Sequence, residues 1–185
     1  MPRHRILGID PGTNILGFAI LEIDGNSLNL VHMGVVKMGH FNEQAEKLRT
    51  IYEHTSAQIE MYQPGSLAIE APFYGKNIQS MLKLGRAQGV AMAAAISHGL
   101  TITEYSPKKI KQSITGNGNA SKEQVAAMLK TIISKEVDDS YLDATDALAT
   151  AVCHHFQMTS LFGNTGKAKD WKKFLADNPE RKWRP

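Results

Sequence analysis

The chain has 185 residues, of which 42% are hydrophobic, and this is enough apolar sequence to build one core, so we expect a single main domain. No run of about 18 apolar residues occurs, and the opening stretch MPRHRILGIDPG lacks the apolar segment of a secretion signal, which argues against a membrane span and predicts a cytoplasmic protein. The single cysteine, Cys153, excludes an internal disulfide framework and a cysteine-based zinc site.

The formal net charge of +3 is spread unevenly along the chain. Residues 161–185 hold seven Lys or Arg against three Asp or Glu, and residues 71–122 hold seven basic residues against one acidic residue. A basic segment in an otherwise acidic body is typical of a surface for a polyanion, although charge alone fits a solvated basic face equally well. We expect residues 1–160 to form the domain and residues 161–185 to be a basic, poorly ordered tail.

The first half of the chain predicts three strands and a helix. The strands cover residues 4–10, 15–24 and 28–38, and the hairpin signal Asp24-Gly25-Asn26 indicates an antiparallel meander. Over residues 42–62 the apolar residues, including Tyr52, recur at spacings of three and four, which predicts an amphipathic helix.

Strands and helices then alternate. The predicted elements are a strand at 66–70, a helix at 78–98, a strand at 101–105, a short basic helix from Ser106-Pro107, a helix capped by Ser121 and Gln124, and a helix at 141–158. The helix at 78–98 is rich in Gly and Ala, which favours close packing against the sheet or against a second subunit. The order of elements predicts an α/β domain with a mixed five-stranded sheet flanked by helices.

Four carboxylates fall at comparable places in these elements. Asp10 ends the first strand, Glu70 ends the fourth, and Asp143 and Asp146 lie three residues apart near the start of the last helix. Carboxylates at strand ends of an α/β sheet would converge at one rim, where their mutual repulsion would favour bound cations. Oxygen ligands without clustered Cys or His favour Mg²⁺ or Mn²⁺.

Each of these residues also has a purely structural interpretation. Asp143 and Asp146 would be stabilised by the dipole at a helix N-terminus, Asp10 would stabilise the Pro-Gly turn that follows it, and Glu70 would be a solvated strand end. The metal-site hypothesis therefore depends on all four residues together.

The sequence resembles the RuvC family of bacterial Holliday-junction resolvases over about residues 4–158. The stretches that carry the resemblance are ILGIDPGTNILGFAI, LAIEAPFYGKN, LKLGRAQGVAMAAA, PKKIKQSITGNGNASKEQV and LDATDALATA. The IDPG motif alone is less specific, because related nucleases and actin-like kinases begin similarly, but the ordered set is highly specific. The resemblance implies a ribonuclease H-like fold.

The resemblance also implies the roles of individual residues. It implies that Asp10, Glu70, Asp143 and Asp146 hold two Mg²⁺ ions per subunit, for which Mn²⁺ would substitute, and that Lys122 assists catalysis. The resemblance implies that Phe73, Lys111 and Lys122 contact DNA, and we expect the same of Tyr74, which follows Phe73, and of three lysines in the basic segment of residues 71–122, namely Lys76, Lys108 and Lys109. Phe73 follows the second carboxylate in a loop-like sequence, so we expect it to stack on a base unpaired at the junction, rather than to lie in the core. The separate roles of Lys111 and Lys122 stay open, because either lysine would serve the reacting phosphate or a flanking one.

The implied activity is metal-assisted hydrolysis that resolves a four-way junction by paired symmetric nicks, leaving 5′-phosphate and 3′-hydroxyl ends, in recombination and DNA repair. The implied partners are a second copy of the chain, because a two-fold substrate requires two sites, and a RuvA–RuvB-type branch-migration complex. Three alternatives are kept: another ribonuclease H-like nuclease, a non-catalytic junction-binding module, and an actin-like phosphotransferase, for which the chain is short.

Overall fold

The computed structural model describes residues 4–72, 77–133 and 141–163, with side chains as far as residue 159. Its strands are β1 (His4–Asp10), β2 (Ile15–Asp24), β3 (Ser27–Lys37), β4 (Ser66–Glu70) and β5 (Thr101–Tyr105). They form a sheet in the order β3-β2-β1-β4-β5, in which β1, β2 and β3 are antiparallel neighbours and β1, β4 and β5 run parallel. The predicted mixed five-stranded sheet is therefore confirmed.

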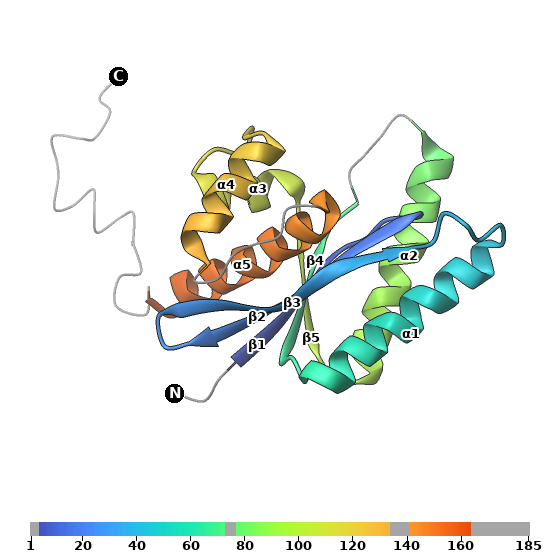
Figure 1. The fold of residues 1–185 in the computed structure, drawn as a ribbon, viewed down its shortest axis with the longest axis horizontal. Helices are drawn as coiled ribbons and strands as arrows, with labels where there is room; N and C mark the ends of the chain where they lie inside the picture. The colour runs from blue at the N-terminus through green and yellow to red at the C-terminus, as the bar shows by residue number, and fades with distance from the viewer. Residues whose placement is uncertain (1–3, 73–76, 134–140, 164–185) are drawn as a thin grey trace, which may run out of the picture. The chain divides into compact units, whose positions relative to one another are not determined.

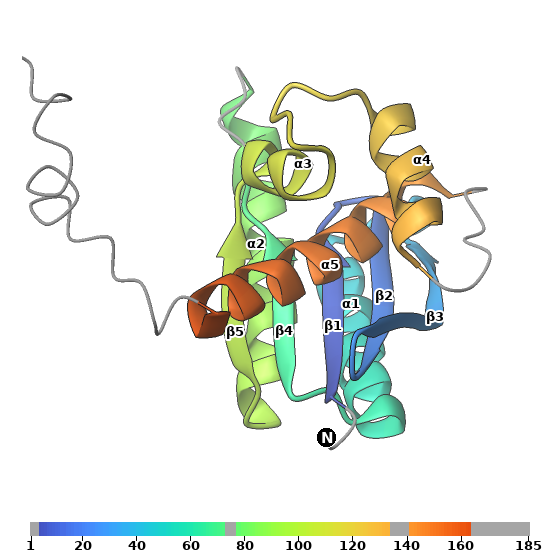
Figure 2. The same ribbon diagram turned by 90° about the vertical axis from the view of Figure 1, so that its left-hand side faces the viewer.

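The described helices are α1 (Gln44–Tyr62), α2 (Ile78–Ser97), α3 (Pro107–Thr115), α4 (Lys122–Ile132) and α5 (Leu142–Gly163). The chain divides into a compact unit of residues 1–155 and a second unit of residues 156–185, whose described part is the last stretch of α5. In the first unit, α1 and α2 cover one face of the sheet, and α5 crosses the other face with α3 and α4 at the same side (Figures 1 and 2).

Residue alternation along β1 builds both layers. Leu7 and Ile9 are fully buried in the core cluster formed with α1 and α2, where Ile51 and Ala91 also lie. Gly8, which lies between them in the sequence, faces the opposite side and lies against α5. This period of two is the expected pattern for a central strand that is covered on both faces.

The approach of α5 to the sheet is close because glycines lie under it. A Cβ added to Gly8 would come within 2.1 Å of the carbonyl oxygen of Ala147, and one added to Gly17 would come within 2.0 Å of that of Asp143. The backbone of α5 therefore lies directly on the backbone of β1 and β2. This contact leaves no room for a side chain at either glycine.

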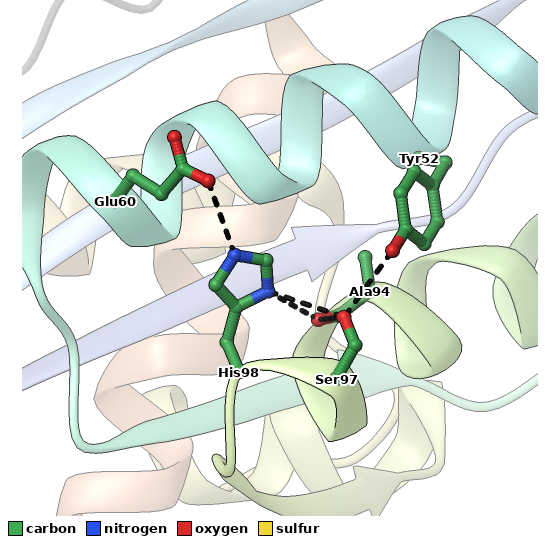
Figure 3. A network of polar contacts seen from close by, with 5 residues as sticks. All are labelled: Tyr52, Glu60, Ala94, Ser97 and His98. Carbon is green, nitrogen blue, oxygen red and sulfur yellow. Dashed lines mark hydrogen bonds and ion pairs between the residues drawn. The ribbon is translucent and has the colours of Figure 1, made fainter.

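The predicted elements match the observed ones closely, with differences at the ends and in one helix face. Helix α1 begins at Gln44 instead of residue 42, and α5 extends to Gly163 instead of residue 158. The predicted apolar stripe of α1 included Tyr52, which is 41% exposed, whereas its neighbour Ile51 is buried. Tyr52 instead lies beside α2, where its hydroxyl is 3.3 Å from the Ser97 Oγ in a polar network (Figure 3).

That network joins α1 to the C-terminal end of α2 on the surface. The His98 Nδ1 lies 2.8 Å from the carbonyl oxygen of Ala94, and its Nε2 lies 3.3 Å from a carboxylate oxygen of Glu60 (Figure 3). The hydrogen bonds to Ala94 and Glu60 raise the pKa of His98. The network fastens the two helices that share one face of the sheet.

The boundary predicted between residues 160 and 161 falls in the last part of α5, beyond the described side chains, and stays a prediction. The tail from residue 164 onward lies outside the described residues.

We expect Gly8→Ala and Gly17→Ala to destabilise the protein by about 1–3 kcal/mol, because the new methyl group must push the backbone of α5 away from the sheet. Both variants should also lose the nuclease activity that the family resemblance implies, because α5 carries Asp143 and Asp146. Thermal unfolding and a nuclease assay test this, with Gly39→Ala as the matched control, since a Cβ at Gly39 meets nothing within 4 Å. Wild-type stability in both variants would contradict this interpretation of the contact.

Candidate active site

The end of the central strand carries the first carboxylate. Asp10 is the last residue of β1, and it pairs with Gly17 of β2 in the antiparallel register. Strand β1 has hydrogen-bonded neighbours on both sides and is covered on both faces, and its pairing with β2 continues as far as Asp10. This restraint fixes where its carboxylate lies.

Helix α5 brings two more carboxylates to the same place. Asp143 lies in its first turn and Asp146 one turn further on, and the contact of the Asp143 carbonyl with Gly17 sets this end of α5 over β2. Carboxylate oxygens of Asp10, Asp143 and Asp146 all lie within 4.8 Å of one another. Three of the four side chains that were predicted to converge are therefore brought together from separate elements.

Glu70 approaches from the neighbouring strand. Strand β4 runs parallel to β1, with Ile69 paired to Ile9, so Glu70 ends beside Asp10. Its backbone carbonyl accepts a hydrogen bond of 3.4 Å from the Nε2 of Gln88, a buried residue of α2 that also donates to the Glu104 carboxylate at 2.7 Å. Glu70 is not a member of the group of three oxygens within 4.8 Å, but it lines the same pocket.

The pocket has a volume of about 270 Å³ and combines acidic, basic and apolar side chains. It is lined by Asp10, Glu70, Pro107, Ile110, Lys111, Lys122, Val125, Asp146 and Ala149. The apolar members come from α3, α4 and α5, and the sequence analysis did not identify them as part of a site. The spacing of these apolar residues along the helices predicted only that they would lie on buried helix faces.

The electrostatics of the pocket are unfavourable without a cation. Burial, together with the charges of Glu70, Asp146 and Asp143, raises the pKa of Asp10 from 3.8 to about 8. Burial and the charge of Asp146 raise the pKa of Glu70 from 4.5 to about 7, against the opposing effect of Lys122 and Lys111. Carboxylates that are this close and this desolvated resist ionisation together unless positive charge is added.

Lys122 supplies part of that positive charge. It is the first residue of α4, whose start is fixed by a capping box between Ser121 and Gln124, and its ammonium forms an ion pair with Asp146. Burial lowers the pKa of Lys122, but the hydrogen bond to Asp146 and the surrounding carboxylates outweigh burial, so the pKa is raised. Lys122 is therefore a cation at the acidic cluster.

The other predicted lysines lie at different distances from the pocket. Lys111 lines it from α3. Lys108 and Lys109 are exposed in the first turn of α3 and do not line it; the Lys108 side chain lies against Gly118, and the Lys109 backbone N–H donates to the Oγ of Ser106. Phe73, Tyr74 and Lys76 lie outside the described residues, so their predicted roles stay predictions.

A sheet of this order, with acidic side chains gathered at the end of its central strand, defines an α/β nuclease with a ribonuclease H-like fold. The family model described as "Crossover junction endodeoxyribonuclease RuvC" matches residues 6–154. The chain belongs to this family and is a nuclease.

Individual relatives and a solved structure agree with this assignment. The crossover junction endodeoxyribonuclease RuvC of Cytophaga hutchinsonii is 54% identical over 177 residues, which cover 95% of this chain and 86% of that protein. Its counterpart in Bacteroides fragilis is 54% identical over 178 residues, covering 95% and 94%. A structure of Thermus thermophilus RuvC in complex with Holliday junction substrate superposes with a TM-score of 0.79 at 28% identity, covering 85% of this chain and 96% of that one.

Among the helices in the described part of the chain, none has the length and apolar character needed to cross a membrane.

The raised pKa of Asp10 predicts a pH-dependent stability. Between its ordinary value of 3.8 and about 8, the folded state keeps a proton that the unfolded state has lost, so the free energy of unfolding should fall as the pH rises through this interval. Without divalent metal at pH 8, Asp10→Asn should therefore melt several degrees above the wild type, and its stability should depend less on pH. Asp24→Asn, at the exposed end of β2, is the matched control, and equal pH slopes for Asp10→Asn and the wild type would contradict the assignment.

Proposed function

We propose that this protein resolves four-way DNA junctions by cutting two opposing strands symmetrically through metal-assisted phosphodiester hydrolysis. The products would be 5′-phosphate and 3′-hydroxyl ends that can be ligated during recombination and DNA repair. The observation that carries the proposal is the convergence of Asp10, Asp143 and Asp146 within 4.8 Å of one another, beside a pocket that Asp10, Asp146 and Glu70 line. The similarity to a RuvC solved with Holliday junction substrate supports the choice of DNA.

The donor set fits divalent cations that prefer oxygen. The candidate ligands are all carboxylates. Burial and mutual repulsion raise the pKa values of Asp10 and Glu70, so added positive charge would favour their ionised forms. We assign Asp10, Glu70, Asp143 and Asp146 as ligands for two Mg²⁺ ions per subunit, with Mn²⁺ as a substitute. Bound ions of this kind supply Lewis-acid stabilisation of a phosphate and lower the pKa of a bound water.

The remaining side chains of the pocket would hold and stabilise the phosphate. Lys122, at the edge of the acidic cluster, is placed to offset negative charge that builds on the phosphate in the transition state. Lys111 would stabilise the same phosphate or contact the next one along the strand. Lys108 and Lys109, in the first turn of α3, would contact the DNA backbone further from the cut. Apolar neighbours such as Ile110 and Val125 exclude water from one wall and strengthen these interactions.

The proposed contacts of Phe73, Tyr74 and Lys76 rest on the sequence. These residues follow β4 and precede α2, so they come shortly after Glu70 in the chain. An aromatic side chain at this place would stack on a base that the junction leaves unpaired, at about 1–3 kcal/mol per stack.

The first test uses a synthetic four-way junction with Mg²⁺. The wild type should produce paired symmetric nicks, and Asp10→Asn should bind the junction without cutting it, because it lacks a metal ligand at the rigid end of β1. Gel analysis of both strands measures the nicks, and a hybrid RNA–DNA duplex is the control substrate. Preferred cutting of the hybrid would identify another ribonuclease H-like nuclease, and binding without cutting by the wild type would identify a junction-binding module.

A homodimer is proposed because a junction with two-fold symmetry requires two equivalent sites. Helix α2 supports this, because its two faces differ. Ala87, Ala91, Ala94 and Ala95 are buried in the core, whereas the opposite face exposes large apolar side chains. Ile78 is 70% exposed, Leu82 51% and Ile96 65%, with exposed Gly85, Gly89 and Ala93 between them. This face is the proposed dimer interface.

The dimer proposal predicts different results for two exposed alanines on neighbouring helices. Ala93→Arg, on the proposed interface, should shift the protein from dimer to monomer in light scattering, because it places a charge in an apolar contact. Ala57→Arg, on α1, should leave the dimer intact. A dimeric Ala93→Arg variant would remove this face from the interface.

The substrate also suggests the setting and the partners. We propose that the protein acts in the cytoplasm, on chromosomal DNA, together with a RuvA–RuvB-type branch-migration complex. The basic tail of residues 161–185 is a further candidate for contact with DNA or with a partner.

A further inference from the structure

The Lys37–Tyr141 pair, on the β3 side of the carboxylates, has no role in the site described so far. Lys37 is the last residue of β3, and its ammonium lies 5.0 Å from the centre of the Tyr141 ring. Tyr141 directly precedes α5 and is 46% exposed, and Lys37 is exposed as well. An ammonium held over an aromatic face is a cation–π contact, and it keeps both groups oriented at the surface.

The pair is connected to the acidic cluster through the backbone of α5. The carbonyl oxygen of Tyr141 accepts hydrogen bonds from the backbone N–H groups of Ala144 and Thr145, at 3.1 Å and 3.2 Å. Tyr141 is therefore tied to the first turn of α5, the turn that carries Asp143. The backbone that carries the ring is therefore fixed relative to the start of α5.

The register of the sheet gives the position of Lys37 at the rim. Lys37 pairs with Ile15 of β2, and Asp10 pairs with Gly17 of the same strand, so Lys37 reaches the same edge of the sheet as Asp10. Strand β3 lies two strands from β1, a lateral separation of about 10 Å. Lys111 follows β5, on the other side of β1, so the two lysines lie on opposite flanks of Asp10.

The Lys37–Tyr141 contact is explained neither by an ion pair of Lys37 nor by compensation of the charge of the acidic cluster. Among the described residues, no carboxylate forms an ion pair with Lys37. The lysines that lower the pKa of Glu70 are Lys122 and Lys111, and the one that lowers the pKa of Asp10 is Lys122. A lysine and a tyrosine that are both exposed and both oriented at a nuclease rim have the chemistry of a backbone contact: an ammonium for a phosphate and a hydroxyl that donates to a phosphate oxygen.

We propose that the Lys37–Tyr141 pair binds the DNA backbone on the β3 flank of the scissile phosphate. This inference rests on the proposed function, because it assumes that a DNA strand crosses the carboxylate pocket. The strand would then be held on both flanks of the reacting bond, by Lys111 of α3 on one side and by the pair on the other. At about 3.4 Å of rise per nucleotide, a separation of about 10 Å places the contacted phosphate within about three nucleotides of the cut.

The test measures junction affinity against salt concentration, without divalent metal so that no cutting occurs. Lys37→Ala should weaken binding about threefold to tenfold at moderate salt and reduce the slope of log K against log salt by about 0.9, the value for one lost phosphate contact. Tyr141→Ala should weaken binding, and Tyr141→Phe should keep most of the affinity because it keeps the ring under Lys37. Lys130→Ala, in the last turn of α4, is the matched control and should keep the wild-type slope.

Replacing single phosphates of the DNA with neutral linkages identifies the phosphate that Lys37 contacts. Methylphosphonate linkages placed singly within three nucleotides of the cut should include one position that weakens wild-type binding but does not weaken Lys37→Ala further. Additive effects at every position would overturn the proposal, as would a wild-type slope for Lys37→Ala. A changed Mg²⁺ midpoint for cleavage with an unchanged slope would assign Lys37 to the carboxylate pocket instead.

The same assays separate this inference from the proposed function. Wild-type protein that neither binds nor cuts the junction would remove the proposed function. Wild-type protein that binds and cuts it, beside a Lys37→Ala variant that behaves identically, would remove the inference alone.

Discussion

The site depends on how closely the backbone of α5 approaches the sheet. The carbonyl oxygens of Asp143 and Ala147 lie where the side chains of Gly17 and Gly8 would be, so the contact is between main chains. A contact between main chains has little freedom to adjust, because neither surface can change rotamer. The spacing between the carboxylate of β1 and those of α5 is therefore set by the fold itself.

This arrangement concentrates negative charge beyond what the protein alone tolerates well. The pKa values of about 8 for Asp10 and about 7 for Glu70 show that burial and mutual repulsion work against ionisation. Lys122 relieves part of the repulsion through its ion pair with Asp146. A divalent cation would relieve the repulsion that remains. The same close packing of carboxylates that destabilises the site without metal would therefore stabilise it with metal bound.

Much of this was predictable from the sequence, for identifiable reasons. Strong apolar patterns, a Pro-Gly turn and a capping box predicted the strands almost to the residue and the helices less closely, since α5 ends at Gly163 instead of residue 158. The position of Asp10 and Glu70 at parallel strand ends predicted that they would meet. The face of α1 was less predictable, because Tyr52 has an apolar ring that fits a buried stripe and a hydroxyl that finds a partner at the surface. The importance of Gly8 and Gly17 was not visible, because a glycine in a strand does not reveal what lies against it.

The pocket was only partly predictable. The lysines of α3 and α4 were identified by their charge and by the family resemblance, but charge does not distinguish Lys111, which lines the pocket, from Lys108, which packs on Gly118. That distinction depends on which way each residue points from a short helix whose buried face is set by Ile110 and Ile114. Pairing between Lys37 and Tyr141 depends on two segments that are far apart in the chain.

The first residue of α4 shows how function limits what helix design would prefer. The aligned peptide dipoles of a helix leave partial positive charge at its N-terminus, and a cation there is unfavourable by about 0.3–1 kcal/mol. Lys122 occupies this position, one residue before Glu123, whose carboxylate suits it. The raised pKa of Lys122 shows that Asp146 and the nearby carboxylates outweigh this cost, so the lysine is favourable here only because the acidic cluster lies beside it. Helix-charge optimisation that placed an acidic residue at this position would add another carboxylate to the cluster, so this position is one to hold fixed in any engineering of the enzyme.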